Sequence, residues 1–164
     1  MRSRKERLFM NVYISKNAEL FHKAVEDIWV AEQVWKVTPN NAVWHCAQAA
    51  EKMMKGLLRC LNEDYDYGHD LSELLNAIEP FVELKPETIK YILYLNGFGI
   101  SLRYKHMKSD PTTDEASIAI SRTKQIVQEF HTYQSISDFI KEAEEVHLKI
   151  LKASSQEAHD KPSG

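Results

Sequence analysis

The apolar residues of this chain recur every three or four positions along almost its whole length, and this spacing constrains the fold most strongly. A period of 3.6 residues belongs to a helix with one buried face, whereas a half-buried strand alternates with a period of two. We find no pair of segments that reads as paired strands, and no internal repeat. The sequence therefore predicts an all-α fold, an up-and-down helical bundle of five or six helices with short connections.

Start and stop signals divide the chain into these helices. Ser15 is the expected N-cap of a first helix, Pro39 suits the first turn of a second, and Asp70 and Thr112 each precede a glutamate by three residues, as in a capping box. The expected helices span about residues 15–36, 39–61, 71–78, 86–95, 112–130 and 135–150. We expect Asn96, Gly97 and Gly99 to interrupt or end the fifth helix, with a short helical turn resuming near residues 101–106.

The length of 164 residues, with 43% hydrophobic content, suits one hydrophobic core rather than two. We divide the chain into an N-terminal extension (1–13), a helical bundle (14–153) and a polar, disordered tail (154–164). The opening MRSRKERLFMNVYIS is basic, but its apolar stretch is too short for a secretory signal. No apolar run is long enough to cross a membrane.

Net charge and cysteine content narrow the functional class. A net charge of −3 and an isoelectric point near 6.2 exclude a globally basic nucleic-acid binder but not a local basic patch. Cys46 and Cys60 fall on one predicted helix, about 21 Å apart, and so do not pair within the chain. Free thiols fit a cytoplasmic protein, and an intermolecular bridge remains open.

Sequence patterns typical of metal sites, phosphate-binding loops and catalytic triads are weak in this chain. Glu19, His22 and Glu26 share a helical face, but a second Glu-x-x-His, as in di-iron bundles, does not occur, and a solvated face explains them. The glycine-bearing segment 96–99 lacks the Gly-Lys-Ser/Thr ending of a P-loop. We therefore expect no metal site and no cofactor, and we assign no nucleophilic triad.

Two basic clusters are more informative. Lys52, Lys55 and Arg59 follow the spacing i, i+3, i+7, which places them on one helix face, although such stripes are often simply solvated. A second cluster interleaves an aromatic residue with cations, a combination suited to a phosphate and a stacked base. Its members are Arg103, Tyr104, Lys105, His106 and Lys108.

Three stretches together resemble a known family. They are QAAEKMMKGLL (48–58), GHDLSELL (68–75) and LRYKH (102–106), the last followed by TTDEASIAISRTKQIV. In this order they resemble the HEPN domain, a small all-α nucleotide-binding module, over about residues 15–130. The resemblance implies a helical bundle that is commonly a homodimer. It also implies a minimal nucleotidyltransferase as a frequent partner, in toxin–antitoxin pairs.

The resemblance extends to individual residues. Gln48, Glu51 and Lys52 match the family's second-helix motif, His69 its helix-opening histidine, and Arg103 and Tyr104 its Arg-Tyr pair; Lys105 stands where a proline is usual. With the basic stripe, this gives a predicted nucleotide-binding set of Lys52, Lys55, His69, Arg103 and Tyr104.

Three functional hypotheses follow. The first is a module that binds a nucleotide, a phosphate or RNA. The second is a metal-independent RNase using Arg103 and His106. RNase members of the family carry a histidine after a gap of four to six residues from the arginine, and here that window holds Lys108, Ser109 and Asp110. We therefore expect weak RNA cleavage or none. The third is an interaction subunit that restrains a nucleotidyltransferase without a ligand of its own.

Overall fold

The computed structural model describes residues 13–65, 68–103 and 110–159, with all their side chains except those of residues 99–103. These residues form helices throughout, with no strand among them, so the predicted all-α bundle is confirmed. The elements are η1 (Lys16–Ala18), α2 (Glu19–Val34), α3 (Pro39–Cys60), α4 (Leu71–Ile78), α5 (Pro86–Arg103), α6 (Thr113–Phe130) and α7 (Gln134–His159).

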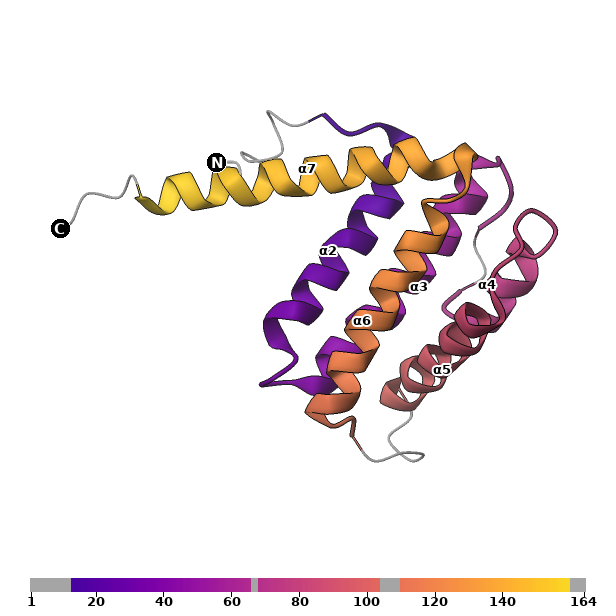
Figure 1. The fold of residues 1–164 in the computed structure, drawn as a ribbon, viewed down its shortest axis with the longest axis horizontal. Coiled ribbons are helices and arrows are strands. Elements are labelled where there is room, and N and C mark those ends of the chain that lie inside the picture. Colours follow the sequence, from indigo (N-terminus) through magenta and orange to yellow (C-terminus); the bar gives the residue numbers. More distant parts are fainter. Residues whose placement is uncertain (1–12, 66–67, 104–109, 160–164) are drawn as a thin grey trace.

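Helix α3 is the centre of the bundle. It packs against α2, α4, α5 and α6, and more lightly against η1 and α7. Figure 1 shows α2, α3 and α6 side by side, α7 crossing one end of them, and α4 with α5 as a hairpin along one edge. The largest fully buried side chains come from most of these elements: Phe21, Met53, Met54, Leu57, Leu58, Leu74, Ile78, Ile92, Leu95, Ile126, Phe130 and Ile136.

Local signals explain most helix starts. Pro39 occupies the first turn of α3, where its missing N–H is not needed. The Thr112 hydroxyl accepts from the amide of Glu115, and the Glu115 carboxylate accepts from the amide of Thr112, a complete capping box for α6. Ser15 does not cap with its side chain as expected, because its hydroxyl donates to Glu142 of α7 instead.

Gly56 allows α2 and α3 to pack closely. A Cβ atom at this position would lie 2.7 Å from Cε1 of Phe21, which has no exposed surface. The glycine in the second-helix stretch is therefore explained by the close approach of an aromatic ring from α2.

The predicted interruption at Asn96, Gly97 and Gly99 is wrong, because α5 runs unbroken from Pro86 to Arg103. Tertiary contacts outweigh the helix penalty of about 1 kcal/mol for each glycine. The Asn96 side chain accepts from the amide of Leu71 at 3.0 Å and donates to Asp70 at 3.1 Å, while Phe98 is buried in the core.

The disordered tail predicted for residues 154–164 is also wrong in its first part. Helix α7 continues to His159, and residues 160–164 lie outside the described residues. The buried residues of α7 end at His147, so its last three turns extend past α2, as Figure 1 shows. A turn at His131 and Thr132 separates α6 from α7, so the last helix is not continuous with the one before it. Within the described part of the chain, no helix combines the length and apolar character needed to span a bilayer.

Candidate functional site

Each cation of the predicted basic stripe on α3 contacts a carboxylate. Lys52 contacts Asp27 of α2, Lys55 contacts Glu51 one turn earlier on α3, and Arg59 contacts Glu19 of α2. The stripe is therefore balanced in charge rather than a free patch of positive charge. Any anion bound there would share these cations with the carboxylates that hold them.

The best-defined polar cluster joins α3 to the loop before α4. We call Glu51, Lys55 and His69 the Glu51 cluster. The Glu51 carboxylate is almost fully buried and accepts from Lys55 Nζ at 2.8 Å, while His69 Nδ1 lies 3.1 and 3.2 Å from its two oxygens. The His69 side chain is 53% exposed. Nδ1 faces Glu51, while Nε2 has no hydrogen-bond partner among the described residues and is available to a ligand from solution.

The local sequence GHD positions this histidine. Gly68 has a φ of +64°, a conformation that favours glycine, and its carbonyl accepts from Lys55 Nζ at 2.8 Å. Asp70 then caps α4 by accepting from the amide and hydroxyl of Ser72 at 2.9 and 2.6 Å. His69 is therefore fixed between a turn anchored on α3 and the start of a helix.

The cap of α4 is also tied to α5 through Asn96, which donates to Asp70. Hydrogen bonds from Ser72, and then from Asn96, lower the pKa of the Asp70 carboxyl below its usual value. The Asp70 carboxyl is thus ionised near neutral pH, and as an anion it accepts the hydrogen bonds that cap α4.

Lys52 belongs to a different cluster from Lys55. Asp27, nearly buried on α2, lies 2.7 Å from His45 Nδ1 and also binds the Lys52 ammonium group. A carboxylate thus bridges an imidazole and a lysine twice along α3, once at Asp27 and once at Glu51. Within one chain, the structure brings Lys55 and His69 onto one carboxylate, while Lys52 binds another.

The remaining predicted site residues lie at or beyond the end of α5. Arg103 is the last residue of α5, and its side chain is outside the described part of the structure, as are Tyr104 and His106. The contact between α5 and the start of α4 is made by Asn96. Seven residues separate Asn96 from Arg103, which is about 10 Å along the helix axis.

Sequence reasoning did not assign Asp27 and His45 to a site, and it matched Glu51 to a motif without giving it a role. The spacing of Glu51 and Lys55, i and i+4, is a local signal for the pair that the structure shows. No comparable signal links Asp27 to Lys52, because the two residues lie on different helices and meet only after folding.

Other chemistries find little support in the described residues. Glu19 is occupied by Arg59, His22 is buried beside Glu26, and no group of three or more potential ligands is arranged for a metal ion within the described ranges. Burial raises the pKa of both thiols, Cys46 and Cys60, to about 11. Both are therefore protonated near neutral pH and poor nucleophiles.

Comparisons with known proteins agree with this architecture. A family model described as "HEPN domain" matches residues 18–133. The crystal structure of TT1696 from Thermus thermophilus is similar, with a TM-score of 0.61 and 18% identity, over 81% of this chain and 99% of that one. At this identity the likeness shows a shared fold. A search of curated proteins finds no significant match.

Proposed function

Since this chain belongs to the HEPN domain family, and is thus a module of the nucleotide-binding or RNase type, we propose that it binds the phosphate groups of a nucleotide or of RNA at the Glu51 cluster. The observation that supports this most is that Glu51 gathers Lys55 and His69, from two separate family-like stretches, onto one buried carboxylate. His69 is the exposed member and makes the direct contact.

The chemistry of this contact depends on the protonation of His69. With Nδ1–H donating to Glu51, a neutral ring offers only an acceptor at Nε2, which repels a phosphate oxygen. Once the ring is protonated, Nε2–H donates to the anion, and Glu51 stabilises the positive charge. A ring that donates from Nε2 therefore binds phosphate better than one that accepts there.

The predicted residues that the structure does not bring to this cluster are further contacts in the proposal. Arg103, the last residue of α5, supplies a bidentate cation, and Tyr104, the next residue in the sequence, supplies a stacking ring. Lys52 follows Glu51 on α3 and binds Asp27. A ligand that reaches both the Glu51 cluster and the end of α5 is longer than a single phosphate, which favours a nucleotide or a short RNA.

The test is a calorimetric titration of the protein with ATP and with a short single-stranded RNA. Each titration is made at about pH 8 and about pH 6, and at two salt concentrations. We expect tighter binding at the lower pH and the lower salt. His69→Ala and Lys55→Met should each weaken binding at least tenfold. Lys149→Met, which removes an exposed lysine from α7, is the matched control and should bind normally. Equal affinity of His69→Ala and the natural chain would refute the site.

Cleavage of RNA is a separate question. The arginine–histidine gap of RNase members is absent here, so we propose that pure protein leaves single-stranded RNA intact or cuts it slowly. Chelator-resistant cleavage that is lost in both Arg103→Ala and His106→Ala would instead make the chain a nuclease.

The biological setting that fits this proposal is a pair with a minimal nucleotidyltransferase, as a toxin and its antitoxin. In that setting the chain either presents RNA or nucleotide to its partner, or restrains the partner without a ligand. Co-purification with a nucleotidyltransferase encoded beside it tests the pairing. Normal pairing by His69→Ala would favour the restraining role, and loss of pairing only in the absence of nucleotide would favour presentation.

A further inference from the structure

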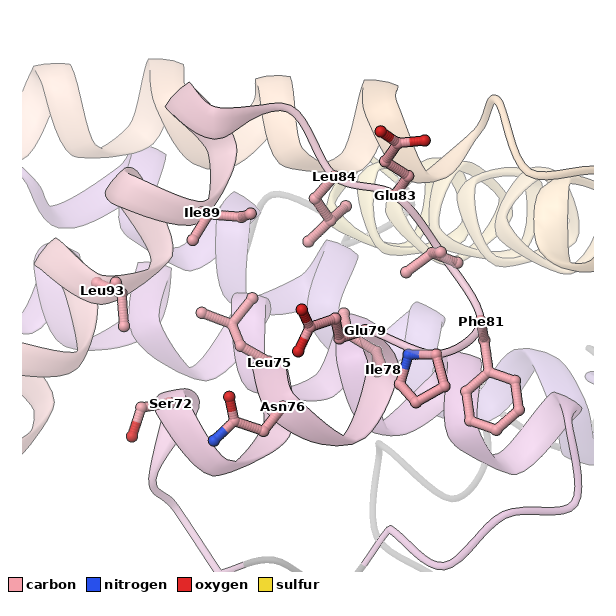
Figure 2. A pocket seen from close by; sticks show the side chains of 12 residues that line it. Ser72, Leu75, Asn76, Ile78, Glu79, Phe81, Glu83, Leu84, Ile89 and Leu93 are labelled. Atoms are coloured by element: carbon pink, nitrogen blue, oxygen red, sulfur yellow. The ribbon is translucent and has the colours of Figure 1, made fainter.

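A groove lies between α4, the loop that follows it, and α5. Its cavity has a volume of about 700 Å³. Figure 2 shows side chains from both helices and from the loop around the hollow. The lining residues are Ser72, Leu75, Asn76, Ile78, Glu79, Pro80, Phe81, Val82, Glu83, Leu84, Ile89 and Leu93.

The walls of this groove are apolar although they face solvent. Phe81, Ile89 and Leu93 are 46%, 38% and 45% exposed. A helix on the surface of a bundle usually presents polar residues outward, but α5 carries apolar residues on its outer face as well as on its buried one. An exposed apolar surface of this kind is typical of a site where another chain segment packs.

The charges in the groove are all acidic. Glu79 directs its carboxylate into the hollow, close to Leu75, and Glu83 lies on the rim (Figure 2). Within the described part of the chain, neither glutamate takes part in a salt bridge. The groove is therefore complementary to a segment that combines apolar side chains with positive charge.

The chain contains such a segment. Residues 1–12, MRSRKERLFMNV, hold four basic residues and one acidic residue, followed by Leu8, Phe9 and Met10. The structural description begins after this segment, at Tyr13. We propose that residues 1–12 of a second copy of this chain dock in the α4–α5 groove, with the apolar residues against its walls and the basic residues near Glu79 and Glu83.

A second copy fits better than the same chain. After Tyr13 the polypeptide is anchored on the other side of the bundle: Ser15 bonds to Glu142 of α7, and η1 packs on α2, α3 and α7. Figure 1 shows α4 and α5 along the edge of the bundle farther from α2. Twelve extended residues span up to about 40 Å, enough to reach an adjacent molecule. Reciprocal exchange of the two segments closes a symmetric dimer, which does not extend into a filament.

The experiment uses three full-length variants and light scattering at micromolar concentration. Glu79→Lys/Glu83→Lys reverses the charge of the groove, and Arg2→Glu/Arg4→Glu/Arg7→Glu reverses the charge of the segment. A third variant carries both sets of substitutions. We expect the natural chain to be a dimer, each single set to weaken dimerisation at least tenfold, and the combined chain to recover it. Asp138→Lys/Glu145→Lys, on the exposed side of α7, is the charge-matched control and should remain a dimer.

Mixing the groove variant with the segment variant identifies the occupant. In the mixture, the intact segment of one chain meets the intact groove of the other, so a heterodimer should form from two weakly associating proteins. If the mixture stays monomeric while the combined chain regains the light-scattering behaviour of the natural chain, the segment docks within its own chain. That result would overturn the proposal. A monomeric natural chain, or a dimer unaffected by the groove variant, would overturn it as well. Recovery in the combined chain also shows that the reversed groove still folds.

Discussion

The contact between Gly56 and Phe21 gives a prediction with a worked magnitude. Replacing Gly56 by alanine places a Cβ at 2.7, 2.9 and 3.0 Å from three carbons of a ring that has no exposed surface and little room to move. Overpacking of this kind costs up to about 3 kcal/mol, and the better helix propensity of alanine returns about 1 kcal/mol. We expect Gly56→Ala to lower the free energy of unfolding by about 2 kcal/mol.

Thermal unfolding followed by circular dichroism measures this change. For a chain of this length, about 2 kcal/mol corresponds to a fall in Tm of roughly 6 °C. If the ring is the cause, the penalty should shrink to near zero in a Phe21→Leu background, because leucine leaves space beside residue 56. The control is Gly68→Ala, where a Cβ meets no atom within 4 Å and only the left-handed backbone is strained. It should destabilise by about 1 kcal/mol in both backgrounds. An unchanged or raised Tm for Gly56→Ala, or the same loss with Leu at position 21, would refute the reasoning.

Three further predictions concern a cap, a buried histidine and a tertiary hydrogen bond. Thr112→Ala removes the capping box of α6 and should cost about 1 kcal/mol in urea unfolding, whereas Thr113→Ala, one residue later, should cost much less. Burial lowers the pKa of His147 below that of the unfolded chain, so its contribution to stability is complete above about pH 6.5 and is lost as the pH falls. His147→Leu should flatten the decline in unfolding free energy between about pH 7 and pH 5, and His159→Leu should not. Asn96→Ala removes two hydrogen bonds to the start of α4 and should destabilise by about 2 kcal/mol; a loss below about 0.5 kcal/mol would contradict its role in keeping α5 continuous.

The proposals for the Glu51 cluster and for the α4–α5 groove are independent of each other. His69 lies before α4 on the side of α3, while Glu79 and Glu83 lie after α4. A variant that loses phosphate binding is therefore expected to remain a dimer. A variant with a reversed groove is expected to keep the pH-dependent binding at His69.

The candidate site was predicted in part. Lys55 and His69 both contact Glu51, because the turn at Gly68, anchored by Lys55, and the Asp70 cap of α4 place the histidine beside α3. Lys52 and Lys55 do not share a site within the chain, although they lie one turn apart. Lys55 pairs with Glu51 on the same helix, whereas Lys52 pairs with Asp27, which comes from α2. Spacing along one helix gives the face of a side chain but not its partner on another helix.

The same division applies to the fold. The all-α fold and the starts of α3 and α6 follow from local sequence, because periodicity, Pro39 and the Thr112 cap act over a few residues. The continuation of α5 through Asn96 and Gly97 depends on tertiary contacts. There, hydrogen bonds to Asp70 and Leu71, with burial of neighbouring apolar side chains, offset a local preference of about 1 kcal/mol per glycine. Local preferences of that size are weaker than two partly buried hydrogen bonds and the packing of the Phe98 ring, so contacts distant in sequence determine this part of the helix.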